Sequence, residues 1–339
     1  DEKYKALALL LADQVHTILA RHREDDSRTG WISGLNEDEG EMHPTKGGLR
    51  IGKKMNERGP SDRFDERVEW DRDGQYYHYL TKWMHALNRV SRVTADTNYN
   101  TWALELAKTV HARFVHVPSS GVRKRIYWKM SIDLSRPLMP SMGHHDPLDG
   151  FITYNQLQLY AADNSEKTEG LDLSDEITDL NTICKGKSWV TDDPLGIGGL
   201  LCDACRLAQM IVSKNFEQID LLEMLLDSSL AGLESYSRMN PLKLPAEYRL
   251  AFRELGLSIG MRAIQMLRKL IEEKPNLFKK RYQLYKHIES LKQYTPLIET
   301  IENFWLERTS RESGSWRDHR DINRVMLATS LLPDGFLTL

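Results

Sequence analysis

Cysteine is scarce in this chain, with 3 among 339 residues. Such a small, odd number argues against a disulfide framework and favours a reducing compartment. A surplus of one charge is also missing, because the formal net charge is −3, and this argues against a nucleic-acid-binding protein. No apolar run reaches the roughly 18 residues that a membrane-spanning helix needs, and no signal-peptide pattern opens the sequence. We therefore expect a cytoplasmic protein that binds neither nucleic acid nor membrane.

Linkers and low-complexity segments are missing too, and the length suits one large domain or two ordinary ones. Apolar residues recur at helical spacing almost throughout, as they do in the first twenty residues. This spacing predicts helices at 3–23, 74–93, 98–116, 147–162, 174–185, 194–214, 217–239, 246–273, 276–308 with a break at Pro296, and 319–331. Residues 122–132 differ, because apolar and polar side chains alternate there and predict a small β-hairpin or strand.

The joints between these helices alternate in length. Tight joints lie near Ala95, Asn215 and Pro275, whereas most of the others are long. Antiparallel helix pairs would gather the long loops on one face, where function is usually carried. Two helices that leave long loops begin alike, at Asp146-Pro147-Leu148 and Asp193-Pro194-Leu195. Asp is a good N-cap and Pro suits the first helical position, so the roughly 50-residue spacing indicates a repeated helical hairpin.

Three motifs that stand before or at helix starts carry a family resemblance: Trp70–His78, Gly143–Pro147 and Trp316–His319. Together with the repeated hairpins, they resemble the six-hairpin (α/α) toroids, a superfamily that includes glycoside hydrolases and the N-acylglucosamine 2-epimerase group. The resemblance implies an all-α fold, namely one (α/α) toroid domain over residues 1–339 with one small β-hairpin. Five hairpins can be counted, and a sixth if the chain splits at Pro296. The resemblance also implies a saccharide substrate and no cofactor.

The first long loop contains a basic, glycine-punctuated stretch, Lys46–Lys54. It comes close to a nucleotide-binding P-loop, but Lys54 stands where Ser or Thr should be, and neither an apolar strand nor a good helix flanks it. A milder interpretation is that Arg50 and Lys53 bind an anionic or hydroxyl-rich ligand. The alternative is a solvated basic turn balanced by the acidic residues 37–41.

The segment Trp70–His78 is the richest in groups that can bind a sugar. Aromatic rings stack on the apolar faces of sugars, and Asp, Arg and His hydrogen-bond the hydroxyls. We expect Trp70, Tyr77 and His78 to bind substrate and Asp71 to act as an acid or base. Asp73 is another candidate ligand, although it also suits the role of helix cap.

Other candidates precede or open later helices. His144 and His145 form a loop pair suited to ligand contact or acid–base chemistry, and no ligand spacing typical of a metal site surrounds them. Asp192 is a spare carboxylate near Trp189, because Asp193 can cap the helix that follows. Cys202 and Cys205 are expected to be buried thiols, and the glycines at 196, 198 and 199 are expected to permit close helix packing.

The last candidates are Arg249, Trp316 and His319, near the starts of the last long helices. Two mechanisms are compatible with this set. In a glycoside hydrolase Asp71 and Asp192 would form the carboxylate pair, whereas in a sugar epimerase His145 and His319 would exchange a proton. We predict the hydrolase. The epimerase, a saccharide-binding scaffold without catalysis and an assembly of identical copies all remain open.

Overall fold

Helices dominate this chain, as the spacing of apolar residues predicts. The computed structural model describes residues 2–119, 121, 123–164, 170–214, 216–278 and 282–339, of which 65% are helix and 5% strand. An all-α class with a small β element is therefore confirmed. Two compact units make up the chain, Asp1–Lys185 and Gly186–Leu339, and each is described by itself. The toroid and the single domain stay predictions.

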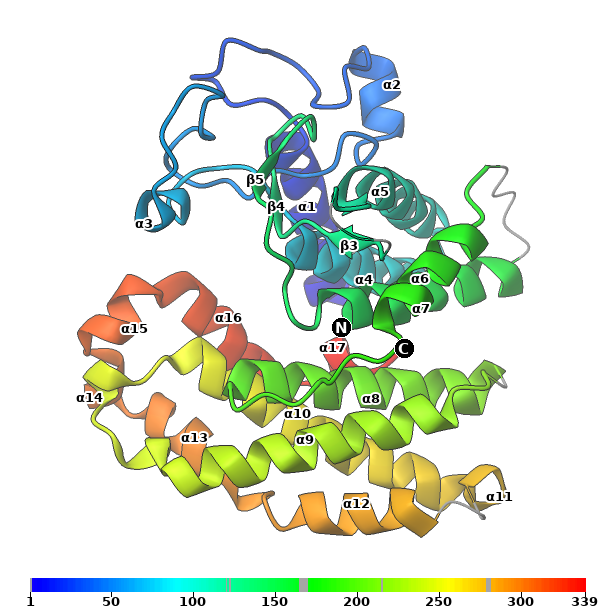
Figure 1. Cartoon of the computed structure of the whole chain (residues 1–339), viewed down its shortest axis with the longest axis vertical. Coiled ribbons are helices and arrows are strands. Elements are labelled where there is room, and N and C mark those ends of the chain that lie inside the picture. Colours follow the sequence, from blue (N-terminus) through cyan, green and yellow to red (C-terminus); the bar gives the residue numbers. More distant parts are fainter. Residues whose placement is uncertain (1, 120, 122, 165–169, 215, 279–281) are drawn as a thin grey trace. The chain divides into compact units, whose positions relative to one another are not determined.

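Long helices in the first unit carry short strands and loops at one end. The helices are α1(Glu2–Leu19), α2(Glu37–Met42), α3(Glu66–Glu69), α4(Tyr77–Thr94), α5(Asn98–Phe114), α6(Asp146–Asp163) and α7(Ser174–Cys184). Helix α4 packs against α1, α5 and α6, and α6 also packs against α7 (Figure 1). The turn between α4 and α5 is tight because Ala95 takes a left-handed conformation, with φ of 61°.

Two small antiparallel sheets belong to the same unit. The strands are β1(Gln75–Tyr76), β2(Val115–His116), β3(Arg125–Ile126), β4(Lys129–Met130) and β5(Pro137–Met139). Strand β4 lies between β1 and β5, whereas β3 pairs with β2. The alternating stretch 122–132, whose first residue lies outside the described part, is therefore not a self-contained hairpin. Its two strands pair with segments from elsewhere, because the chain leaves one sheet after Ile126 and enters the other at Lys129.

The second unit is built around the packed pair of helices α8 and α10. The elements are α8(Pro194–Lys214), α9(Ile219–Met239), η1(Pro241–Lys243), η2(Ala246–Tyr248), α10(Ala251–Glu273), α11(Pro275–Phe278), α12(Tyr282–Lys292), α13(Pro296–Leu306), α14(Arg308–Arg311), α15(Gly314–Asp318), α16(Arg320–Leu331) and α17(Asp334–Leu337). Helix α8 packs against α9 and α10, α9 against α12, and α10 against α13 and α16. The expected break at Pro296 is confirmed, since α13 begins there.

Glycines allow α8 and α10 to cross closely. A Cβ atom on Gly198 would overlap the carbonyl oxygen of Gly256 and lie 2.8 Å from the amide nitrogen of Leu257. A Cβ on Gly260 would lie 2.6 Å from the Cα of Gly198. These separations leave no room for any side chain, so close helix packing is the reason for Gly198, as the sequence predicts. The same expectation is wrong for Gly199, where an added Cβ would meet no atom within 4 Å.

The middle of α8 is buried. Cys202 and Cys205 pack with Ile259 and Ala263 of α10, and burial raises the pKa of the Cys205 thiol to about 12. The expectation of buried thiols is confirmed. By length and composition alone α8 could cross a membrane, but 72% of its most apolar window is buried inside the protein. The same helix also buries an ion pair, in which the Arg206 guanidinium lies 3.2 Å from Asp203.

A buried histidine makes the stability of the first unit depend on pH. His16 of α1 is 5% exposed, and its Nε2 accepts a 3.1 Å hydrogen bond from the Trp83 indole of α4. Burial lowers the pKa of His16 from 6.5 to about 4. Between pH 6.5 and pH 4, His16 is therefore protonated in the unfolded chain and neutral in the native state. We expect the free energy of unfolding to fall by about 2–3 kcal/mol over this window because of His16.

The variant His16→Gln separates this contribution from the rest. Urea unfolding at pH 7, 6, 5 and 4.5 should give a shallower loss of stability for the variant than for the wild type. His78, whose pKa burial also lowers to about 4, contributes in the same direction in both proteins. Equal slopes in the two proteins would show that His16 is not held neutral in the native state.

Candidate functional site

Strand pairing brings two distant aromatic segments together in the first unit. Gln75 pairs with Met130 and Tyr76 with Lys129, so that Trp128 comes to lie beside the segment Trp70–Tyr79. The Trp128 carbonyl accepts a hydrogen bond of 3.2 Å from the amide of Tyr77, and its own amide donates to Ser141 at 2.8 Å. The backbone of Trp128 is therefore held on both sides.

The side chains that meet here form what we call the aromatic platform: Trp70, Tyr76, His78, Tyr79 and Trp128. Trp128 stacks on Tyr76 with ring centres 5.1 Å apart, and Trp70 meets Trp128 edge-on at 4.7 Å. Tyr79 and His78 continue the cluster, with ring centres 4.4 Å apart. Trp70 is 48% exposed and Tyr79 44%, whereas Tyr76 is buried beneath them. Exposed aromatic rings anchored on buried ones provide a firm apolar surface for a ligand.

An acidic side chain stands next to the platform. Asp71 follows Trp70 and is exposed. It is also close enough to Tyr76 to affect the phenol: burial raises the pKa of Tyr76, and the charges of Tyr79, Glu69, Asp73 and Asp71 raise it further, in that order. The platform thus offers apolar rings and a carboxylate side by side.

A buried ion pair supports the platform from below. Lys129 of β4 is completely buried, and its Nζ donates to Glu69 Oε1 at 2.9 Å and to the carbonyls of Glu69 and Arg72 at 2.7 and 2.9 Å. Arg58 donates to the other oxygen of Glu69 at 3.0 Å. Burial is the main cause that lowers the pKa of Lys129. Lys129 therefore ties the end of α3 and the segment before β1 to β4.

Asp73 does not cap a helix, contrary to the expectation for it. Helix α4 begins only at Tyr77, and Asp73 is fully buried further back in the chain. Its carboxylate accepts hydrogen bonds from Arg50 at 3.0 Å and from the amides of Gly52 and Gly74 at 2.9 Å each. Because the first long loop binds the Asp73 carboxylate through Arg50 and Gly52, this side chain is not available to cap α4.

The basic stretch 46–54 is part of this support and does not form a nucleotide P-loop. Arg50 also donates to the carbonyls of Arg21 and Ile18, both at 2.9 Å, near the end of α1. The amides of Leu49 and Gly52 already donate to the side chains of Gln75 and Asp73. A P-loop needs such amides for phosphate and needs a strand before and a helix after them, and the structure places neither beside this stretch. The Lys53 carbonyl accepts from Arg23, and its side chain is partly exposed.

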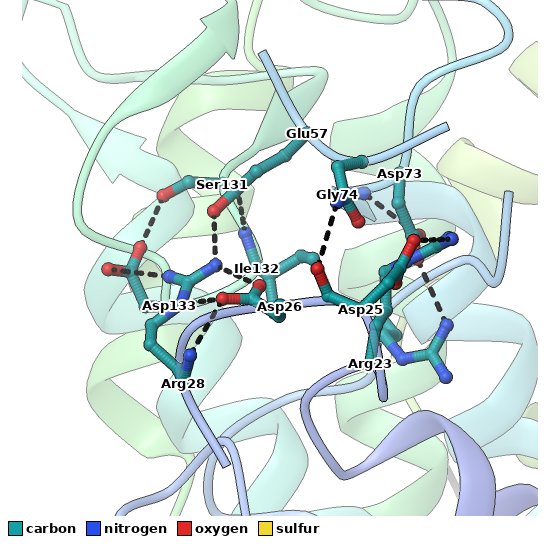
Figure 2. A network of polar contacts seen from close by, with 12 residues as sticks. Arg23, Asp25, Asp26, Arg28, Glu57, Asp73, Gly74, Ser131, Ile132 and Asp133 are labelled. Carbon is teal, nitrogen blue, oxygen red and sulfur yellow. Dashed lines mark hydrogen bonds and ion pairs between the residues drawn. The ribbon is translucent and has the colours of Figure 1, made fainter. Parts of the chain in front are cut away.

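A second polar network fixes the loop to β4 (Figure 2). Arg28 lies among three carboxylates, at 2.8 Å from Asp26, 2.6 Å from Glu57 and 3.3 Å from Asp133. Glu57 also accepts from the amide of Ile132 at 2.6 Å. Hydrogen bonding to Arg28 lowers the pKa of Asp26 to about 2. These contacts tie the irregular loop to the residues that follow β4.

The other candidates in the first unit lie on α4 and before α6. Tyr77 is fully buried, with its ring centre 5.7 Å from that of Phe114. His78 is partly exposed, and burial lowers its pKa to about 4. His144 and His145 have ring centres 4.6 Å apart just before α6. Asp146 is not the N-cap of α6, since His145 holds that position and the Asp146 carboxylate accepts from the Gly143 amide at 3.1 Å.

In the second unit the start of α8 matches its prediction. Asp193 accepts a hydrogen bond from the amide of Gly196 at 3.3 Å, which is an N-cap contact, and it pairs with Arg253 of α10 at 2.8 Å. Asp192 is exposed, in keeping with its description as a spare carboxylate. Trp189 is buried. Asp71 belongs to the first unit and Asp192 to the second, so their pairing stays a prediction.

The remaining candidates lie at the end of the second unit formed by α10, α13, α15 and α16. Arg249 is buried and holds Glu254 with two hydrogen bonds of 2.9 and 2.6 Å. The Trp305 indole donates to the same carboxylate at 2.8 Å. Trp316 is buried and stacks on Trp305, whereas His319 is exposed and meets Phe252 edge-on. Arg249 is already occupied by protein partners, and a ligand-binding role for it stays a prediction.

Comparisons with known proteins do not assign this chain to a family. No protein-family model, curated protein or solved structure matches this chain. Among the residues that the structure describes, no group of three or more His, Cys, Asp or Glu side chains is placed to hold a metal ion. The aromatic platform with Asp71 is therefore the arrangement on which a function can best be argued.

Trp128 is the member of the platform that the sequence analysis missed. It lies in the alternating stretch, where its neighbours indicate only a strand. In the sequence Trp128 is one of the alternating apolar residues of that stretch, and no local signal distinguishes it as a ligand-binding ring. The expected residues Trp70, Asp71 and His78 do come together with it, and Asp73 and Arg50 come together behind it.

Proposed function

We propose that this protein binds saccharides on the aromatic platform and acts on them there. The observation that carries the proposal is the exposed pair Trp70 and Tyr79 beside the exposed carboxylate of Asp71. Sugar rings present apolar C–H faces that stack on indole and phenol rings, and hydroxyls that donate hydrogen bonds to a carboxylate. A firm backing of buried ion pairs supports such a role, because a preorganised surface loses little entropy on binding.

The reaction that we propose is glycoside hydrolysis, with Asp71 as one carboxylate; the choice of Asp192 as the second stays a prediction from the sequence, since it belongs to the other unit. Both are exposed, and Asp192 precedes a helix that Asp193 already caps. In such enzymes one carboxylic acid protonates the leaving oxygen and the other acts as base or nucleophile. The proposal includes the (α/α) toroid, and it is supported by the helical hairpins α4–α5, α6–α7 and α8–α9.

Removing a platform ring should weaken sugar binding. We expect Trp70→Ala to raise the Kd for its oligosaccharide by about tenfold or more, because one stacked face of a sugar buries enough apolar area for 1–2 kcal/mol. Calorimetric titration with cello-, xylo- and malto-oligosaccharides measures it. Tyr4→Ala, which removes an exposed ring on α1, is the matched control and should leave the Kd unchanged. Equal affinity in Trp70→Ala and wild type would refute the platform as the site.

Turnover separates the reaction from binding. Asp71→Asn and Asp192→Asn should each lower kcat by about 10²–10⁴ while the Kd stays close to that of the wild type. His145→Ala and His319→Ala should keep most of the activity. Loss of activity in the two histidine variants alone would replace hydrolysis by proton transfer on a free sugar. If the wild type binds sugars but turns over no glycoside, the protein is a saccharide-binding protein without catalysis.

A further inference from the structure

A basic groove runs along one end of the second unit. Its volume is about 490 Å³, and residues of α14, α15 and α16 line it. Five of them are arginines, all exposed: Arg308, Arg311, Arg317, Arg320 and Arg324. Glu312 is the one acidic residue in its lining. The groove therefore carries a strong local positive charge in a chain whose net charge is −3.

Internal pairing neutralises little of this charge. Arg308 is 2.8 Å from Glu312, in a pair whose side chains are 89% and 61% exposed. Arg320 is 3.8 Å from Asp321, which is almost fully exposed. Exposed pairs of this kind contribute little and are screened by water and salt. Arg317 and Arg324 have no side-chain partner among the described residues. Five guanidinium groups around one groove repel each other, and a bound anion would relieve that repulsion.

All the cations that line the groove are arginines, and no lysine is among them, which indicates the kind of anion that it suits. Arginine presents a planar fork of donors that matches two oxygens of a phosphate, whereas lysine is a point charge. Arg320 and Arg324 are one helical turn apart on α16 and so lie on the same face. Several such forks in the lining of one groove favour a tetrahedral dianion over a single carboxylate.

Part of the groove lining is apolar. Leu327, Ala328 and Leu331 of α16 contribute aliphatic surface, and Trp316 contributes an indole. Trp316 is held by stacking on Trp305 and by a 3.0 Å hydrogen bond from Asn323 to its carbonyl. A ligand with only charged groups would leave this apolar surface uncovered. The lining thus suits a molecule with an anionic end and an apolar part.

We propose that this groove binds a small molecule that carries a phosphate group and an apolar portion. Its volume lies within the roughly 300–1,000 Å³ typical of small-molecule sites. A nucleic acid would need a longer basic stripe to follow successive phosphates, and the overall charge of the chain opposes that class. The phosphate contacts Arg317 and Arg324, and the apolar portion covers Leu327 and Leu331.

The experiment is a calorimetric titration of the full chain with phenyl phosphate and with inorganic phosphate at constant ionic strength. Phenyl phosphate should bind about tenfold more tightly, because its ring covers the apolar part of the lining. The double variant Arg317→Gln/Arg324→Gln should lose at least tenfold in affinity for both. Arg324→Lys keeps the charge without the fork and should show an intermediate loss. Saturating phenyl phosphate should also raise Tm by roughly 5 °C in the wild type and not in the double variant.

Arg268→Gln is the matched control, since Arg268 is a partly exposed arginine of the same unit, outside the groove, paired with Glu272. It should bind both probes as the wild type does. Circular dichroism confirms that each variant is folded. Equal binding by the double variant and the control would overturn the proposal, as would equal affinity of the two probes. Tight binding of a long polyanion such as heparin without binding of phenyl phosphate would also overturn it, in favour of a macromolecular partner.

Discussion

Gly198→Ala should destabilise the second unit by about 3 kcal/mol, one of the two largest effects that we expect. The added methyl group meets the backbone of Gly256 and Leu257, which cannot rotate away as a side chain can. Either α10 moves outward and opens gaps along α8, or both helices strain to accept the atom. Chemical unfolding followed by circular dichroism measures the loss as a lower midpoint.

The neighbouring residue provides a matched control. Gly199 is on the same helix, but a Cβ there would have no atom within 4 Å. Gly199→Ala should therefore stabilise the unit by about 0.5–1 kcal/mol, because alanine loses less backbone freedom in a helix than glycine does. Two alanine substitutions one residue apart should thus have opposite signs. If Gly198→Ala were also stabilising, α8 and α10 would not cross at Gly198.

Lys129→Met should cost the first unit about 3 kcal/mol or more. The change leaves Glu69 in a buried position with Arg58 as its remaining cation, and two backbone carbonyls lose their donor. Breaking one side of a buried pair costs 3–5 kcal/mol, because the other charge stays buried without full compensation. The free energy of unfolding in urea, at pH 7, measures the effect.

Lys108→Met tests whether burial is the cause. Lys108 also holds a carboxylate, that of Glu176 at 2.8 Å, but its side chain is 30% exposed. Such a pair near the surface contributes about 0.2–1 kcal/mol. Similar losses in Lys108→Met and Lys129→Met would contradict the description of Lys129 as a buried anchor. The platform rings should also show altered fluorescence in Lys129→Met and not in Lys108→Met, because only Lys129 supports them.

Features that depend on neighbours in the sequence could be predicted. The start of α13 at Pro296 and the cap of α8 by Asp193 follow rules that act within one helical turn. The buried thiols of α8 followed from their spacing on an apolar helix. In each case the competing interactions were few, so the local preference decided the outcome.

Features that depend on partners distant in the sequence could not be predicted. Asp73 has the sequence context of a cap, but Arg50 and the amide of Gly52 reach it from a loop more than twenty residues earlier. Trp128 joins Trp70 only because β1 and β4 pair. The basic groove was missed because its arginines come from three short helices whose joints carry no apolar periodicity. Side-chain type alone could not separate buried Arg249 from exposed Arg324.

The close crossing of α8 and α10 at Gly198 and Gly256 also matters while the chain is being synthesised. Helix α8 is 21 residues long and apolar enough to span a membrane, yet Gly256, which closes over Gly198, is made about 60 residues later. At a translation rate of roughly 5–20 residues per second, this delay lasts about 3–12 seconds. During that time the face of α8 that α10 later covers has no partner in that helix. Asp203 and Arg206, already side by side in that helix, make it a poorer substrate for insertion while it waits for α10.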